Sequence, residues 1–143
     1  MKERISFAYV TQILPGMVVN QTKYPTIWWT DVDPNVKHVV AMTMGVIIDK
    51  THFVTVTLDI HHEDSSESCI KEGQSGPNQY DHYVFYPENR DEFIGISTII
   101  INNVNLVKTG IYTLVVKIQN GDHVLDEKET SFFVANLKGS DHV

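Results

Sequence analysis

Cysteine is almost absent from this sequence, and long apolar runs are missing. The one cysteine, Cys69, cannot form an intramolecular disulfide, so nothing indicates an oxidising compartment. No apolar run approaches the roughly 18 residues of a membrane-spanning helix. Residues 5–14 are interrupted by polar side chains, whereas the apolar part of a secretory signal is more uniform. We therefore expect a cytoplasmic protein without membrane contact.

Clustered basic residues are missing as well. The 143 residues include 11 basic and 18 acidic side chains, for a net charge of −7. Residues 63–93 carry eight acidic and two basic side chains, a balance of −6, so nearly all of the net charge lies in this stretch. A nucleic-acid-binding protein needs clustered lysine and arginine to neutralise phosphates. We therefore expect no nucleic acid among the partners.

Apolar residues recur with the period of two that is typical of half-buried strands. Apolar and polar side chains alternate between Val54 and Ile60, and again between Tyr112 and Ile118. Runs rich in β-branched and aromatic residues predict further strands over residues 5–14, 26–30, 37–48, 81–86, 95–104 and 130–137. Asn120-Gly121 predicts a two-residue hairpin turn with both residues at positive φ. The charged residues 126–129 predict a bulge or short loop in the returning chain.

Short strands between turn residues, with few helix signals, predict the fold class. They favour an all-β protein, and we expect an antiparallel immunoglobulin-like β-sandwich. The length fits one domain and no linker divides the chain, so residues 1–143 are expected to form a single β-sandwich domain. Residues 61–80, rich in Ser, Glu, Gly and Gln, are expected to form one long acidic loop.

Several of the expected strands carry apolar residues at adjacent positions, which point to opposite faces of a sheet. These runs are Trp28-Trp29, Val39-Val40, residues 46–48, residues 99–101 with Ile99 and Ile101, and Phe132-Phe133. Contiguous exposed apolar patches usually mark interaction surfaces. We therefore expect a second covered surface, most simply covered by another copy of the chain. The alternative is a short helix or the long loop lying over the outer face.

Histidines gather at one strand end, where zinc ligands are conceivable. His61 and His62 precede an acidic stretch, with Cys69 and His82 further along. Zinc needs three or four converging ligands at recognisable spacings. His61 and His62 point to opposite faces if the strand continues through them. A strand end entering a solvated acidic loop is the preferred interpretation, so we expect no bound metal or cofactor.

Two other site patterns are incomplete. Residues 31–35 match the first ligand positions of a calcium loop, but Val36 and Met42 stand where glycine and glutamate belong. Asp and Asn there favour a turn. Cys69 lies between Glu67 and Glu72, where negative charge disfavours the reactive thiolate. With no phosphate-binding glycine loop either, we expect no catalytic activity.

Aromatic residues form the remaining candidate site. Tyr24, Trp28 and Trp29 are close together, and on a strand one tryptophan faces the core while the other faces outward. An outward tryptophan is suited to stacking on a sugar ring or to anchoring a protein interface. The alternative is that Trp29 packs under a neighbouring loop.

Residues 109–121, with Gly110-Ile111-Tyr112 opening a strand that ends at Asn120-Gly121, resemble the closing hairpin of immunoglobulin-like domains. With the strand over residues 5–14, the layout is similar to small uncharacterised bacterial immunoglobulin-like β-sandwich proteins of unknown function. The cysteine–tryptophan–cysteine pattern of true immunoglobulin domains is missing. The resemblance implies a fold and no catalytic or ligand-binding residues.

These observations favour a non-catalytic β-sandwich protein that acts through contacts with itself, as a homo-oligomer, or with another protein. Tyr24, Trp28, Trp29, Ile99 and Ile101 are the candidate interface or ligand-binding residues. One alternative is a carbohydrate or small-ligand binding module that uses the exposed aromatic residues. The other is a metal-dependent enzyme that uses His61, His62 and His82.

Overall fold

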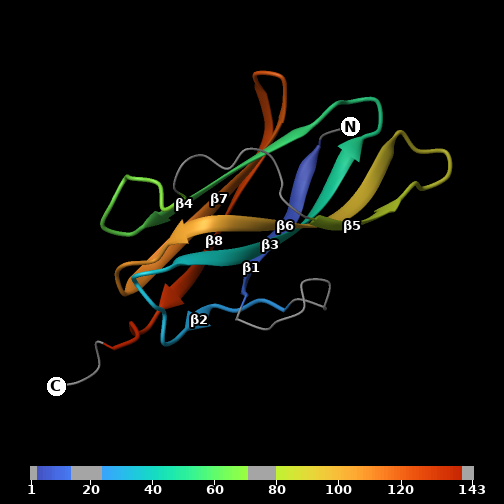
Figure 1. The fold of residues 1–143 in the computed structure, drawn as a ribbon. Coiled ribbons are helices and arrows are strands. Elements are labelled where there is room, and N and C mark those ends of the chain that lie inside the picture. Colours follow the sequence, from blue (N-terminus) through green and yellow to red (C-terminus); the bar gives the residue numbers. More distant parts are fainter. Residues whose placement is uncertain (1–2, 14–23, 71–79, 140–143) are drawn as a thin grey trace.

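The computed structural model describes residues 3–13, 24–70 and 80–139, and only the backbone at residues 80–83. Every element in this part of the chain is a strand (Figure 1). The strands are β1 (Arg4–Gln12), β2 (Trp28–Trp29), β3 (Lys37–Asp49), β4 (Thr55–His62), β5 (Tyr80–Phe85), β6 (Glu92–Asn105), β7 (Gly110–Asn120) and β8 (His123–Val134). The all-β prediction is therefore confirmed. Among these residues no helix is long and apolar enough to cross a membrane.

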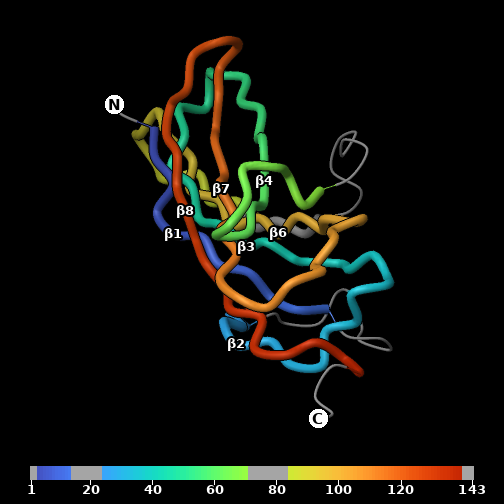
Figure 2. The backbone as a smooth tube through the Cα atoms, turned by 90° about the vertical axis from the view of Figure 1, so that its left-hand side faces the viewer, coloured from blue at the N-terminus to red at the C-terminus, as the bar shows by residue number. Residues whose placement is uncertain are grey.

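The strands form two four-stranded sheets. The first sheet has the order β1-β3-β6-β5 and the second has the order β2-β8-β7-β4. Neighbouring strands are antiparallel, except that the short β2 runs parallel to β8. The β7-β8 hairpin and the β3-β4 turn lie at one end, and β2 lies at the other (Figures 1 and 2). Two sheets around one core agree with the expected sandwich.

The core lies between the sheets and is built from alternate residues of the long strands. Along β7, Tyr112, Leu114, Val116 and Ile118 are buried, whereas the residues between them are partly exposed. Burying each such side chain stabilises the fold by about 1.5–3 kcal/mol. At the β2 end, the Trp29 ring stacks on Phe132 at a centroid distance of 4.2 Å. The period-two patterns over β4 and β7 thus identified core residues correctly.

Strand β8 differs from its prediction in one respect. The sequence predicted a bulge or short loop at residues 126–129 before a last strand over residues 130–137, whereas β8 is one strand from His123 to Val134 with a bulge next to the charged residues. Ile118 pairs with Asp126 and Gln119 pairs with Val124, so Leu125 is an extra residue in a bulge. The bulge directs Asp126 to the first sheet, where its Oδ2 accepts a hydrogen bond from the backbone N of Ile5 at 2.7 Å. One carboxylate therefore links the two sheets.

The β7-β8 turn is also corrected. Asn120 pairs with His123, so the two loop residues are Gly121 and Asp122 rather than Asn120 and Gly121. Only Gly121 has a positive φ, of 63°. Glycine at the first loop position is typical of a type II′ hairpin, which, like type I′, follows the twist of the flanking strands. The hairpin itself was predicted correctly, but its turn lies one residue later.

The segment after β4 also links the two sheets, through the backbone of Cys69. The backbone N of Cys69 donates to Ile60 of β4 at 2.7 Å, and the N of Asn105 in β6 donates to Cys69 at 2.8 Å. Residues 68–70 thus lie between an edge of the second sheet and the first sheet. The expected loop over residues 61–80 is wrong at its ends, because β4 runs to His62 and β5 begins at Tyr80, and residues 71–79 lie outside the described part of the chain.

Tyr112 fixes the connection from β6 to β7. Its hydroxyl donates a hydrogen bond to the backbone oxygen of Lys108 at 2.8 Å. Its ring is 1% exposed and lies between Phe132, at a centroid distance of 5.4 Å, and His62, at 4.9 Å. Burial raises the pKa of Tyr112, because an ionised phenolate would be poorly solvated there, and the hydrogen bond with Lys108 opposes this only in part.

Candidate functional site

The outer face of the first sheet is apolar and exposed. The register places Phe7, Gly45 and Ile96 in one row across β1, β3 and β6. Ile47, Ile94 and Phe85 form the next row across β3, β6 and β5. We call Phe7, Ile47, Phe85, Ile94 and Ile96 the apolar face. Phe7, Ile94 and Ile96 are 40%, 41% and 37% exposed, so each leaves substantial side-chain surface to the solvent.

Gly45 explains how Phe7 lies on this face. A Cβ at Gly45 would overlap the Phe7 ring, so the ring packs directly over the glycine backbone. An extra residue in β1 between Ile5 and Phe7 shifts the register and sets this alignment. In the neighbouring row, the hydroxyls of Thr43 and Thr98 bond to each other at 2.9 Å. Arg4 of β1 pairs with Ile47 and is exposed, so the rows of the apolar face carry one described charged side chain, at their β1 end.

Several residues that the sequence suggested for an interface are instead core residues. Trp29 and Ile101 are fully buried, and Ile99 is 8% exposed. Ile99 pairs with Met42 and Ile101 with Val40, and all four belong to the core. A run of three isoleucines does not reveal which positions face inward, because apolar periodicity vanishes within it. These three residues therefore offer no surface to a partner.

The other two candidates are exposed but lie apart, Trp28 on the second sheet and Tyr24 outside the strands, next to β1. Trp28 is 66% exposed on the outer side of the second sheet, where its ring contacts Phe133 at a centroid distance of 5.2 Å. Tyr24 is 70% exposed, and its backbone oxygen accepts a hydrogen bond from Thr11 of β1 at 2.6 Å. No ring contact between described residues joins Tyr24 to Trp28. Of the two tryptophans, one faces inward and one outward, as predicted.

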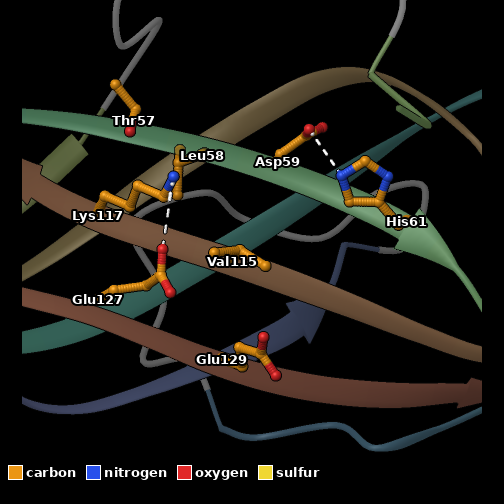
Figure 3. A pocket seen from close by; sticks show the side chains of 8 residues that line it. All are labelled: Thr57, Leu58, Asp59, His61, Val115, Lys117, Glu127 and Glu129. Atoms are coloured by element: carbon orange, nitrogen blue, oxygen red, sulfur yellow. Dashed lines mark ion pairs between the residues drawn. The ribbon is translucent and has the colours of Figure 1, made fainter. Parts of the chain in front are cut away.

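The outer face of the second sheet contains an open pocket of about 510 Å³, within the range of ligand sites. Side chains from β4, β7 and β8 line it side by side (Figure 3). They are Thr57, Leu58, Asp59, His61, Val115, Lys117, Glu127 and Glu129. We call this the polar pocket. Of its residues only His61 was a candidate from the sequence, because the others are brought together by three strands whose order the sequence does not reveal.

The charges in the polar pocket are partly paired. Lys117 Nζ lies 3.5 Å from Glu127 Oε1, and His61 Nε2 lies 2.8 Å from Asp59 Oδ2. Ser68 also donates a hydrogen bond to Asp59. Glu129 takes part in none of the ion pairs between described residues. The pocket therefore has three carboxylates against one ammonium group, and Glu129 is the carboxylate that is available.

The two adjacent histidines point to opposite faces, as predicted. His61 faces the polar pocket, whereas His62 is 6% exposed and packs edge-on against Tyr112. His62 Nε2 bonds to the backbone oxygen of Thr109 at 2.7 Å, and its Nδ1 accepts from the N of Asp64 at 3.1 Å. Both ring nitrogens of His62 thus form hydrogen bonds with backbone groups. The side chain of His82 lies outside the described part.

No group of three metal-ligating side chains occurs among the described residues. In the loop over residues 31–35, Asp33 Oδ1 accepts a hydrogen bond from the backbone N of Asn35 at 2.9 Å. This is the Asx-turn that the turn interpretation implies. Asp31 has a φ of 53°, a conformation that aspartate tolerates better than most residues.

The chain has no match among models of protein families or among curated protein sequences. The candidate surfaces therefore rest on their geometry and chemistry.

Proposed function

We propose that this chain is a non-catalytic β-sandwich protein that acts through protein–protein contacts, and that it self-associates through the apolar face of the first sheet. The single observation that carries the proposal is the apolar patch of Phe7, Ile94 and Ile96 in two adjacent rows, each more than one-third exposed, with Arg4 as the one described charged side chain in these rows. In a chain with 29 charged residues among 143, from 11 basic and 18 acidic, such a face is unusual for a surface that meets only water.

A twofold dimer suits this face because the same patch then serves both copies. Five side chains from each copy become buried, and each contributes about 1 kcal/mol because part of its surface is already covered. The total free energy gained by burial, about 10 kcal/mol, exceeds the lower estimates of the free-energy cost of association, about 4 kcal/mol, by about 6 kcal/mol. We therefore expect dimerisation at micromolar rather than nanomolar concentrations.

We infer further that the sandwich is immunoglobulin-like. In immunoglobulin constant-type domains one sheet has strands A, B, E and D and the other has C, F and G. If β1 and β3 to β8 are lettered A to G in chain order, the sheet β1-β3-β6-β5 becomes A-B-E-D and the strands β4-β7-β8 become C, F and G. Tyr112 near the start of β7, with its hydroxyl on Lys108, corresponds to the tyrosine corner between strands E and F. Strand order and corner both support the inference.

The experiment is a measurement of molar mass by light scattering from about 1 to 200 µM. The wild-type chain should approach twice its mass of 16.3 kDa as the concentration rises. Ile96→Glu places a charge in the centre of the apolar face and should hold the chain at its single mass. A wild-type mass of one chain throughout the range would refute self-association.

The matched control is Val124→Glu. Val124 is 43% exposed on β8 of the second sheet, close to the 37% of Ile96. Each substitution therefore replaces a similarly exposed β-branched apolar side chain with one negative charge. Val124→Glu should dimerise like the wild type. Equal loss of dimer in both variants would show that the charge acts through net repulsion and not through the apolar face.

A further inference from the structure

Trp28 is presented on the second sheet as a supported platform. Its ring is 66% exposed and is backed by Phe133, at a centroid distance of 5.2 Å. The register continues from Phe133 to Ile111 on β7, which is 43% exposed. A large aromatic ring held by a second ring offers a flat apolar surface at low entropic cost.

Hydrogen-bonding groups follow this platform along the same outer face. Side chains on one face of a strand recur every two residues, or about 7 Å. The next row contains Ser131 and Thr113, whose hydroxyls lie 3.2 Å apart. The row after that contains Glu129, and the polar pocket extends over this row and the rows of His61 and Lys117 on either side of it (Figure 3). The face therefore changes from aromatic to hydroxyl to carboxylate over about 14 Å.

This sequence of groups fits one ligand chemistry. A sugar ring has an apolar face of C–H groups, which stacks on an aromatic ring, and a rim of hydroxyls, which bond to hydroxyl and carboxylate oxygens. Carboxylates are strong acceptors for such hydroxyls. Three carboxylates against Lys117 disfavour an anionic ligand, so acidic sugars and phosphates do not fit.

We propose that the outer face of the second sheet binds a neutral oligosaccharide, with one ring stacked on Trp28, the next sugar at Ser131 and Thr113, and a third at Glu129. This site lies on the opposite sheet from the apolar face, so binding does not depend on self-association. Because three rows take part, a trisaccharide is the shortest ligand that fills the site, and longer chains extend toward Lys117 and Glu127.

The test is isothermal titration calorimetry of the full chain with neutral gluco-, manno- and N-acetylglucosamine oligosaccharides of one to six units. We expect saturable binding in at least one series, with affinity rising at least tenfold from one to three units and little beyond four. Trp28→Ala should weaken binding at least tenfold, Trp28→Phe should retain part of it, and Glu129→Ala should weaken it about tenfold.

Phe53→Ala is the matched control, because Phe53 is an 80% exposed aromatic residue in the turn between β3 and β4, at the opposite end of the molecule from β2 and Trp28 (Figure 1). It should leave binding unchanged. A flat response to all three series overturns the proposal, as does binding that Trp28→Ala leaves intact. Saturable binding of hexalysine, with none of the oligosaccharides, would instead identify the face as a site for cationic peptides and would also overturn it.

Discussion

Tyr112 is a single residue on which two parts of the molecule depend. Its ring packs between Phe132 and His62, and its hydroxyl holds the backbone at Lys108 where the chain passes from the first sheet to the second. A hydrogen bond of this kind contributes about 0.5–1.5 kcal/mol to stability, and leaving its partner unsatisfied costs more. The residue also makes stability sensitive to pH, because burial raises its pKa.

We predict that stability falls at alkaline pH through Tyr112. The folded state keeps the phenolic proton above pH 10.0, the ordinary pKa, whereas the unfolded state releases it. Above pH 10.0 the unfolded state therefore binds fewer protons, and the free energy of unfolding decreases as pH rises until the raised pKa is passed.

Urea unfolding between pH 8 and 11 measures this dependence. Tyr112→Phe should be less stable at pH 8 by about 1 kcal/mol, and its stability should decline less steeply above pH 10. Tyr24→Phe, at an exposed tyrosine, should follow the wild-type curve. Parallel curves for the wild type and Tyr112→Phe would contradict the prediction.

Residue identity alone predicted some of these roles. Alternation marked Tyr112 as inward-facing, and Trp28-Trp29 implied one buried and one exposed ring. The alternation of apolar and polar residues did not reveal that Ile96 faces outward while Ile99 faces inward. Inside residues 94–101 most side chains are apolar, so only the pairing of Ile96 with Gly45 and of Ile99 with Met42 distinguishes the faces.

At the scale of elements, the junction of β4 and β7 depends on Gly110. Its φ is 123°, which other residues rarely adopt. A Cβ there would overlap Glu63 Oε2 and lie 2.9 Å from His62 Nε2. Glu63 in turn accepts a hydrogen bond from the N of Ile111 at 2.8 Å. The missing side chain therefore leaves room for two groups that secure the start of β7.

We predict that Gly110→Ala destabilises the fold by about 3 kcal/mol. Backbone strain contributes about 1–3 kcal/mol, and displaced hydrogen bonds of Glu63 and His62 add about 1 kcal/mol. Gly121→Ala is the control, because Gly121 also has a positive φ but open space around it. That change should cost about 1–2 kcal/mol.

Urea unfolding at one fixed protein concentration compares the two variants. Equal losses would mean that backbone conformation alone explains the effect and that the contacts of Glu63 and His62 contribute nothing. An unchanged slope of free energy against urea concentration would show that both variants unfold in the same way as the wild type.

Elements were predicted well where periodicity was clear and poorly where tertiary contacts decide. Strands β4 and β7 followed from alternation, and the β7-β8 hairpin from its glycine. The charged residues of β8 left a bulge and a short loop open as alternatives, and only the hydrogen bond from Ile5 to Asp126 and the pairing with β7 show the bulge. Sheet order was beyond reach, so the polar pocket across β4, β7 and β8 could not be assembled.

At the scale of the whole molecule, charge and apolar surface act in opposite directions. Each chain carries −7, so two chains in a dimer carry −14 and repel each other. The five residues of the apolar face are uncharged, and Arg4 is the one described charged side chain in their rows. The self-association that we propose for this face would therefore work against long-range repulsion that salt can screen.

We predict that added salt strengthens the dimer. Raising NaCl from 0.1 to 1 M shortens the screening length from about 10 to 3 Å and weakens the repulsion between chains. The dissociation constant, measured by analytical ultracentrifugation, should fall about three- to tenfold. Ile96→Glu should stay monomeric at both concentrations. A dissociation constant that rises with salt would indicate ion pairs at the interface instead.

The contacts along two edge strands limit how large an assembly can grow. Cys69 occupies part of the outer edge of β4, and Thr26, whose N donates to Val10 at 2.9 Å, occupies part of that of β1. Exposed strand edges are where molecules join into open-ended ribbons. Because these positions are already taken, β1 and β4 offer less free edge to which further copies of the proposed dimer could add.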